Sequence, residues 1–390
     1  MFIFFLSAPV LAQGLGPIDW VQHVLSHQPA LEATRLEVQS IEALHESIAV
    51  PLPAFQVGLA PISLSPDSPL GIQAQISQTL PIDLQEQRRV LEVERAIAET
   101  TSAHQVLMIQ HAALYDYAQW LEHCDKWSLS QAHEQVLLQH RDAVNARILS
   151  NKSQFAHQLL MESKHAQQQQ VSVRWEGECM ASGQQLQRWV PDLDMKDMTP
   201  AVEWPPNGSG TSDQHPQIEG ISLRIDSANA ESEVWEKKKR PTPGFMAQFN
   251  TMNPMPEHHW MIGGQVSWTR PQKRKSVQNS LWLEQEKSKA QQMDTQRQLL
   301  TAKKKSETRL ESLKVEYRWL EQETLPRLKS EREALLALFD SAQIPLASVI
   351  DVEHRLLAQK ERQLEILADS WRTYADWSLA SNTVLVEVNP

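Results

Sequence analysis

Apolar and polar residues alternate with a period of two in four short stretches of the chain, residues 55–60, 72–80, 245–250 and 260–269. A period of two is that of a β-strand, so the pattern predicts four strands of about ten residues each. In every stretch one face carries the large aliphatic and aromatic side chains. The opposite face carries Gln, Ser and Thr in residues 72–80 and 260–269, and mainly small or polar residues in the other two stretches. Strands with one apolar and one polar face are typical of a membrane β-barrel with a water-filled interior. A small soluble sheet packed on helices is the alternative.

Long segments without helix-breaking residues follow the strands. Neither Gly nor Pro occurs from Leu84 through Glu176 or from Gln272 through Leu325, and residues that favour helices dominate there. A helix from Leu84 to about Ile148 would be about 95 Å long. No single globular core is that long, so the helices need partners along their whole length. We therefore expect antiparallel coiled-coil hairpins.

Each hairpin requires one turn, and polar breaks mark both turns. The first is expected at residues 150–153 and the second at residues 340–345. Helix ends leave backbone groups free for a partner, so the tips are candidate contacts with an adaptor protein. A simple capping turn is the alternative. The candidate contact residues are Ser150, Asn151, Lys152, Ser153, Ile344, Pro345, Leu346 and Ala347.

The chain is a tandem duplication. Ile72, Gln75, Ser77, Thr79 and Pro81 recur at a constant offset as Ile262, Gln265, Ser267, Thr269 and Pro271. Each half therefore contains a helix, a strand hairpin and a long helical hairpin. The predicted organisation is an export signal at 1–12, a first repeat at 13–176, a linker at 177–213 and a second repeat at 214–390. Within the repeats we place the strand hairpins at about 54–81 and 244–270, and the helical hairpins at 82–176 and 272–385.

Composition narrows the classes of function. The 48 acidic residues outnumber the 37 basic ones, giving a net charge of -11, which argues against nucleic-acid binding. An apolar stretch followed by small residues, up to Ala12, resembles an export signal. No motif of a hydrolase, nucleotide-binding enzyme or metalloprotease is present, so we expect no enzyme and no cofactor. Cys124 and Cys179 show no metal-binding spacing, and we expect two ordinary thiols, with one disulfide as the alternative.

Four strands are too few to close a membrane barrel, so the barrel must be shared between chains. Two chains would give about eight strands and a filled interior, whereas three would give about twelve and a lumen. The predicted fold class is therefore mainly α, with tandem-duplicated helical hairpins that form an α-barrel. A small β contribution from each chain completes a twelve-stranded barrel in a homotrimer.

The order and duplication of these features resemble the TolC-like outer-membrane efflux proteins over nearly the whole chain. Each half starts a helix at His-x-Pro or His-Pro, as at His27 and His215, and ends a strand hairpin in Ser-x-Thr-x-Pro, as at Ser77 and Ser267. The resemblance implies a trimeric, non-enzymatic channel in outer-membrane lipid, with its helices in the periplasm. It also implies a periplasmic adaptor and an inner-membrane efflux transporter as partners. An exported periplasmic coiled-coil scaffold, or an adaptor without a barrel, is the alternative.

A Met- and His-rich strand connection resembles that of the heavy-metal efflux branch of this family. Thioether and imidazole groups suit soft or borderline ions, although methionines beside a lipid-facing strand also serve as apolar anchors. The exported substrates would then be heavy-metal cations, with drugs as the alternative. The candidate metal-binding residues are Met252, Met255, His258, His259 and Met261.

The segment after the second hairpin turn resembles the periplasmic gate of the family. Asp351 matches its acidic position, and His354 lies three residues further on, where a second acid is often found. Three copies of Asp351 around an axis would repel each other and attract cations. His354 would make closure depend on pH. An ordinary acid on a solvated helix face is the alternative.

Overall fold

A computed structural model of the chain describes residues 16–47, 54–61, 70–79, 84–148, 155–191, 200–201, 203–206, 215–251, 258–267, 270–341 and 343–385. The chain forms two compact units. We call Met1–Leu31, Gln105–His215 and Gln298–Pro390 the hairpin unit, and Glu32–His104 and Pro216–Arg297 the sheet unit. Both units take segments from both halves of the sequence, so the two compact units do not correspond to the two halves of the duplication.

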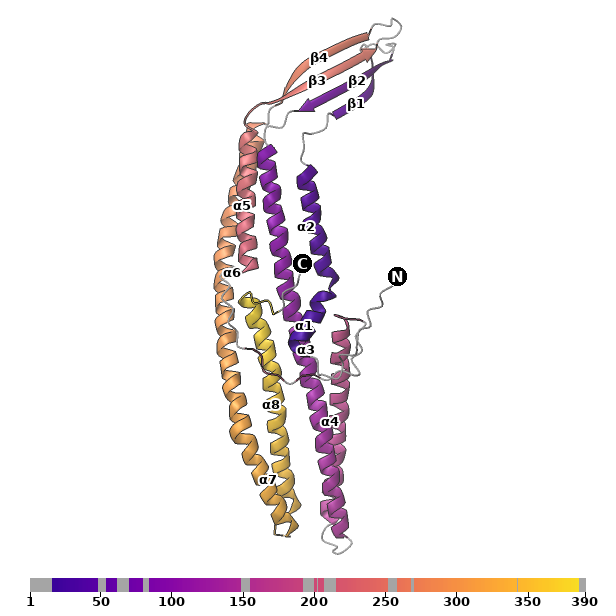
Figure 1. The fold of residues 1–390 in the computed structure, drawn as a ribbon, viewed down its shortest axis with the longest axis vertical. Coiled ribbons are helices and arrows are strands. Elements are labelled where there is room, and N and C mark those ends of the chain that lie inside the picture. Colours follow the sequence, from indigo (N-terminus) through magenta and orange to yellow (C-terminus); the bar gives the residue numbers. More distant parts are fainter. Residues whose placement is uncertain are drawn as a thin grey trace, which may run out of the picture. The chain divides into compact units, whose positions relative to one another are not determined.

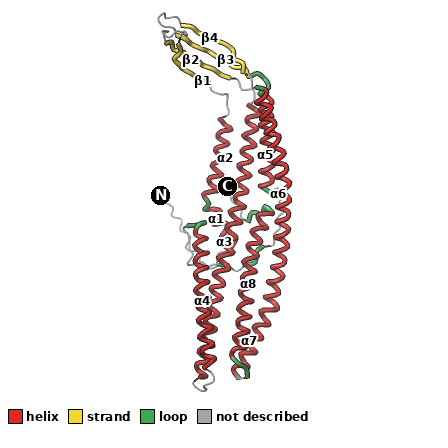
Figure 2. Tube along the Cα trace, turned by 180° about the vertical axis from the view of Figure 1, so that it is seen from behind, coloured by secondary structure: helices red, strands yellow, loops and turns green. Residues whose placement is uncertain are grey.

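The sheet unit contains the four predicted strands, β1 (Ala54–Pro61), β2 (Leu70–Thr79), β3 (Thr242–Thr251) and β4 (His258–Ser267). They form one antiparallel sheet in the order β1-β2-β3-β4 (Figure 2). The central pairing, β2 with β3, joins the two halves of the duplicated sequence. Alternating residues favour this extended backbone because successive side chains point to opposite faces.

The register separates apolar from polar positions. Ile76 pairs with Ala247, which pairs with Ile262, whereas the adjacent row pairs Gln75 with Gln248. Ile262 is 83% exposed. The exposed large apolar residues described in the sheet are Ile76, Phe245, Ile262 and Val266, and all four lie on one face by the two-residue period. The described part of the sheet therefore presents an exposed apolar face.

Helices of the sheet unit are α2 (Pro29–Ser47), α5 (Pro216–Lys237) and the first parts of α3 (Leu84–Ile148) and α6 (Pro271–Trp319). Side-chain bonds tie these helices to one another. Arg95 of α3 pairs with Glu42 of α2 at 2.9 Å, and Arg89 of α3 pairs with Glu233 of α5 at 2.8 Å. Gln285 of α6 donates to Asn229 of α5 at 2.8 Å.

The hairpin unit contains α1 (Pro17–Ser26), the rest of α3 and α6, α4 (Phe155–Gln187), α7 (Leu325–Asp340) and α8 (Leu346–Ala380). Figure 1 shows α3 beside α4, and α8 beside α7 and the later part of α6. The predicted long helix is observed, since α3 has the expected bounds, and the second turn falls between α7 and α8 as predicted. The first predicted turn, at residues 150–153, lies outside the described residues.

Apolar clusters hold the hairpins together. The seam along α3 is buried, with Leu114 and Ala118 at 0% exposure, and it packs with Trp20 of α1 and Trp371 of α8. The Trp20 indole also donates to the Ala113 carbonyl at 3.0 Å. A second cluster near the hairpin turns joins α3, α4, α7 and α8, and its buried members are Leu137, Val144, Met161, Phe339, Leu346, Val349 and Ile350.

The structure corrects the expected start of the linker. α4 continues through Gly177 to Gln187, although the sequence composition placed the linker at 177–213. One glycine costs a helix only about 1 kcal/mol, and the following turns are held by packing, since Leu186 is fully buried. The second hairpin is interrupted instead by a π-helical turn at Leu320–Thr324, just before Pro326, whose missing N–H disrupts regular α-helical bonding.

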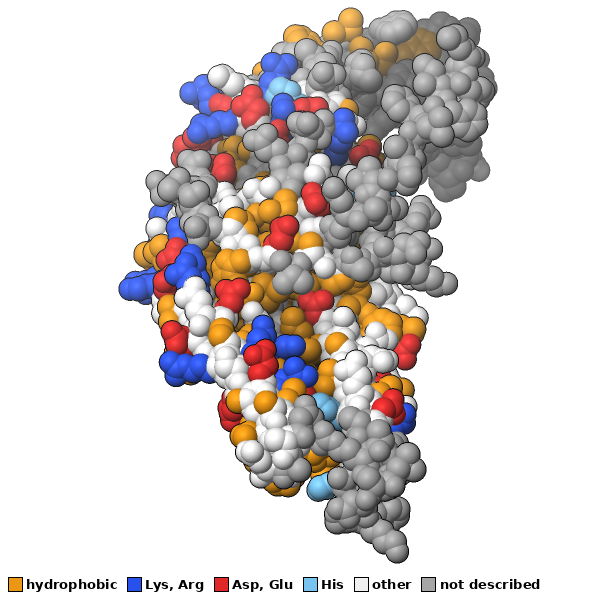
Figure 3. All heavy atoms as spheres, turned by 60° about the horizontal axis from the view of Figure 1, so that its bottom comes forward, with side chains coloured by type: hydrophobic (Ala, Val, Ile, Leu, Met, Phe, Trp, Pro, Cys, Tyr) orange, Lys and Arg blue, Asp and Glu red, His pale blue; other side chains and the backbone are white. Residues whose placement is uncertain are grey.

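Among the described residues, no helix combines the length and the apolar character needed to cross a membrane. On the face drawn in Figure 3, acidic and basic side chains are interspersed with exposed apolar ones. Residues 1–12, which we expect to be an export signal, lie outside the described residues.

Candidate functional site

Asp351 lies on α8 in an exposed position, as a gate residue requires. Its side chain is 70% exposed and pairs with Arg355 one turn further along at 3.1 Å. Arg355 also donates to both carboxylate oxygens of Glu331 on α7, at 2.6 and 3.3 Å. Hydrogen bonding to Glu331 raises the pKa of Arg355. Asp351 is therefore a solvent-accessible carboxylate whose charge is partly offset by one arginine.

His354, the second candidate gate residue, has a different environment from that of Asp351. It is half-buried, and its ring lies 5.8 Å from the ring of His133 on α3, measured between centroids. Its Nε2 atom is buried and has no hydrogen-bond partner. Burial lowers the pKa of His354, and the nearby Lys164 and His133 lower it further. His354 thus contacts the first hairpin instead of extending an exposed acidic surface.

Glu353, which the sequence did not single out, is the buried charge of this region. It is 4% exposed, and its Oε1 atom accepts hydrogen bonds from His140 of α3 at 2.8 Å and from Arg332 of α7 at 3.0 Å. Burial alone would raise the pKa of Glu353, but the bonds from His140 and Arg332 lower it overall. One carboxylate therefore ties three helices together.

A cavity of about 130 Å³ lies against this carboxylate. The cavity is large enough for a few water molecules. Its polar lining is His133, Arg332, Glu353 and Lys360, and its apolar lining is Leu129, Ala132, Val136, Leu356 and Leu357.

A second ionic cluster links the hairpins through Lys126 of α3. Its ammonium donates to Glu122 of α3 at 2.8 Å and to Glu365 of α8 at 2.9 Å. Arg372 of α8 donates to the other oxygen of Glu122 at 2.7 Å. Burial acts to raise the pKa of Glu122, but hydrogen bonds from Lys126 and Arg372 leave it lowered.

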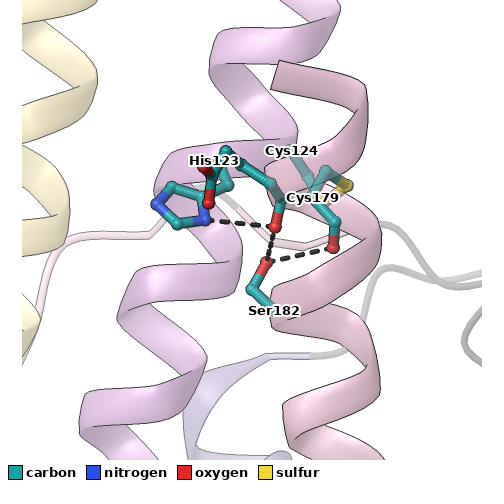
Figure 4. Close-up of a disulfide and its surroundings, with 5 residues drawn as sticks. His123, Cys124, Cys179 and Ser182 are labelled. Carbon is teal, nitrogen blue, oxygen red and sulfur yellow. Dashed lines mark hydrogen bonds between the residues drawn. A yellow bond between two sulfur atoms is a disulfide. The ribbon is translucent and has the colours of Figure 1, made fainter. Parts of the chain in front are cut away.

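A disulfide joins Cys124 of α3 to Cys179 of α4, so the expectation of two ordinary thiols was wrong (Figure 4). The two Cα atoms are 4.7 Å apart. His123 and Ser182 lie beside the bond, and each is within hydrogen-bond distance of the Glu178 carbonyl, at 3.2 and 2.8 Å. The pairing was not evident from spacing because it depends on where two long helices meet.

The described hairpin tip supports only some of the expected partner contacts. Pro345 and Ala347 are exposed, whereas Leu346 is fully buried and Ile344 packs against the second apolar cluster. Leu346 is thus not available for direct contact in this chain. Ser150, Asn151, Lys152 and Ser153 lie outside the described residues.

The metal-binding candidates are not brought together by anything that the structure describes. Met252 and Met255 lie outside the described residues, and His258, His259 and Met261 are positions of β4 whose side chains are also outside them. Within the described part of the chain, no group of three or more His, Cys, Asp or Glu residues is arranged to hold a metal ion.

Solved structures of outer-membrane channels share this fold. A structure of CusC, described as a transmembrane channel, has a TM-score of 0.76 at 12% identity, over 94% of this chain and 91% of that one. VceC, an outer-membrane protein of Vibrio cholerae, gives 0.74 at 12% identity, over 94% and 95%. The CmeC channel of Campylobacter jejuni gives 0.77 at 10% identity, over 94% and 86%.

No family model matches the sequence, and no curated protein matches it. The superpositions nevertheless cover almost the whole chain and confirm the predicted TolC-like fold. The fold is therefore the one seen in solved outer-membrane channels such as CusC and CmeC.

Proposed function

We propose that the chain is the outer-membrane duct of a tripartite efflux system, through which substrates pass passively from the periplasm or an inner-membrane pump to the exterior. The observation that carries this proposal is the match of its fold to outer-membrane channels over 94% of the chain. The exposed apolar sheet face supports it, because an outward apolar band is what lipid contact requires. Ile262 and Phe245 supply this surface at 83% and 65% exposure.

We further propose that three copies assemble. Each chain contributes four strands, and three copies would supply about twelve, enough for a barrel with a lumen. Exposed apolar residues on α4 support lateral packing of hairpins. Leu159, Val173 and Met180 are 52%, 67% and 59% exposed and recur at heptad spacing, which forms a seam for a neighbouring helix.

The helical part would lie in the periplasm. The Cys124–Cys179 disulfide supports an exported location, because disulfides persist in oxidising compartments such as the periplasm and are rare in the cytosol. In this arrangement the turns between α3 and α4 and between α7 and α8 would face the adaptor. Cysteines introduced at Asn151 and Ala347 should cross-link to it, and absence of an adduct at both positions would count against this contact.

Within a trimer, three copies of the exposed Asp351 would form an anionic constriction that selects or is blocked by cations. We also propose that the Met- and His-rich connection between β3 and β4 contacts heavy-metal cations during export. Thioether and imidazole ligands suit such ions. Weak contacts are sufficient, since tight binding would slow release from a channel.

Two measurements test the proposal that the chain is an outer-membrane duct. They are the heat-modifiable mobility of outer-membrane fractions on SDS gels and the mass of the unheated protein in detergent. A heat-sensitive trimer in the outer-membrane fraction is the expected result. A monomer in the soluble periplasmic fraction would refute the duct and leave an exported coiled-coil scaffold or adaptor as the function.

A further inference from the structure

A buried imidazole and a half-buried one meet where the first hairpin contacts the second. His133 of α3 is 8% exposed, and its ring lies 5.8 Å from the ring of His354 on α8, inclined by 58°. Neither nitrogen of His133 has a hydrogen-bond partner, and the buried Nε2 of His354 has none. The nearby Gln168 amide donates to the Ser130 hydroxyl and carbonyl, at 2.8 and 3.1 Å. Gln168 also lies close enough to His133 to favour its protonated form, but burial outweighs this effect and lowers the pKa of His133 overall.

The surroundings of the pair contain more cationic groups than anionic ones. The basic groups are Lys164 from α4, Arg332 from α7, Lys360 from α8 and the His140 imidazole from α3; the acids are Asp351 and Glu353, both from α8. No ion pair or hydrogen bond of Lys360 is found among the described residues.

The two acids leave one buried acceptor oxygen free to balance the charge of two protonated rings. Glu353 already accepts from His140 and Arg332 through one oxygen, and Asp351 pairs with Arg355 at the surface. The second oxygen of Glu353 is buried without a partner, so a single carboxylate oxygen would have to serve two imidazolium groups. Protonating both rings at 5.8 Å would place like charges side by side in a poorly solvated site.

We propose that His133 and His354 form a proton-sensitive contact that holds α3 against α8 when both rings are neutral and releases α8 when they are protonated. The inference rests on the proposed function in one respect, that separating the two hairpins would widen the periplasmic end of a duct. Protons are the only ligand that this contact requires.

The direction of the pH dependence follows from the lowered pKa values. Burial is the main cause of the lowering for both His133 and His354, so the folded contact binds protons more weakly than the separated helices do. The contact is fully stable above the ordinary histidine pKa of about 6.5. It loses stability as the pH falls below that value, because proton binding then favours separation.

Hydrogen exchange on the intact protein in detergent tests the contact without requiring channel activity. Peptides from residues 129–140 of α3 and 349–360 of α8 should lose protection several-fold between pH 7.5 and pH 5.5, after correction for intrinsic exchange rates. The double variant His133→Phe/His354→Phe, which keeps two packed rings that cannot titrate, should retain protection at both pH values. His354→Gln alone provides a smaller change if the double variant does not fold.

A matched control is His157→Gln, which removes an imidazole from α4 and leaves the pair intact, so it should behave as the wild type. The proposal is overturned if the wild-type peptides keep their protection at pH 5.5, or if the His133→Phe/His354→Phe and His354→Gln variants lose it as the wild type does. Conductance in planar bilayers separates this result from the proposed function. Loss of protection in a protein that forms no channel at any pH would refute the duct and support the contact.

Discussion

Glu353 and Asp351 are two residues apart on α8, yet their carboxylates have opposite environments. The Glu353 side chain is 3% exposed and binds His140 and Arg332, whereas the Asp351 side chain is 70% exposed and binds Arg355. Two residues span about 200° of an α-helix, so one carboxylate enters the contact between the hairpins and the other faces solvent.

Removal of these two acids should therefore have different effects on stability. Glu353→Ala leaves the partly buried His140 and Arg332 donors unpaired and should lower the free energy of unfolding by about 2 kcal/mol. Asp351→Ala removes an exposed ion pair and should lower it by less than about 1 kcal/mol. Urea unfolding followed by circular dichroism compares the two variants, and equal losses would contradict the assigned environments.

Substitution of Asp125 should raise the stability of the fold, whereas substitution of Glu353 or Asp351 should lower it. Burial raises the pKa of its carboxyl to about 6, and its Oδ2 atom has no hydrogen-bond partner. A raised folded-state pKa means that Asp125 stabilises the fold only when protonated, and that this contribution is lost as the pH rises through about 6. Asp125→Asn should therefore raise stability by about 2 kcal/mol at pH 8 and have little effect at pH 4. Unfolding curves at both pH values test this, and a uniform shift would exclude titration as the cause.

The disulfide should contribute measurably to the first hairpin. The bond closes a loop across 55 residues, and a loop of that length corresponds to about 4 kcal/mol in the chain-entropy view. Cys124→Ser/Cys179→Ser should therefore lower the urea midpoint for loss of helix. Wild-type protein treated with a reducing agent serves as the control and should match the double variant. An unchanged midpoint in both would show that packing alone holds α3 to α4.

The sequence predicts the elements that depend on local patterns, but not the contacts between residues far apart in the chain. α3 was predictable because its 65 residues lack Gly and Pro, and the strands were predictable from their period of two. The bond between His140 and Glu353 joins residues 213 positions apart, and no local pattern marks it. The same holds for the disulfide. The predicted end of α4 was too early because Gly177 indicates a break in the helix. The packing of Leu186, which keeps the following turns helical, is not visible in the sequence.

The exposed sheet face leads to a prediction about membrane assembly. Ile262→Asp places a charge on the apolar face and should reduce the yield of heat-modifiable trimer, because a carboxylate facing lipid near the bilayer centre is destabilising, by less than the roughly 2–4 kcal/mol for Lys or Arg. Gly263→Asp is the matched control. It lies one position along β4, so its side chain points to the opposite face, and no atom lies within 4 Å of an added Cβ. Comparable trimer yields from the two variants would argue that the apolar face does not contact lipid.

The proposed gate at Asp351 leads to a prediction about cation block. Asp351 is exposed, and its partner Arg355 is already engaged by both oxygens of Glu331. Three such carboxylates near one axis would concentrate divalent cations, because like charges raise the local negative potential. Asp351→Asn removes the charge with almost no change in shape and should weaken block of single-channel current by divalent cations added on the periplasmic side.

Glu331→Gln is the matched control for this measurement. It removes an acid that also binds Arg355 but belongs to α7, so block should change less than in Asp351→Asn. The Arg355 ion pair with Asp351 would remain, which keeps the structural effect comparable in the two variants. Block that is equally strong in wild type and Asp351→Asn would remove Asp351 from the constriction. Equal weakening in both variants would assign the effect to the Arg355 cluster instead of to a ring of Asp351 carboxylates.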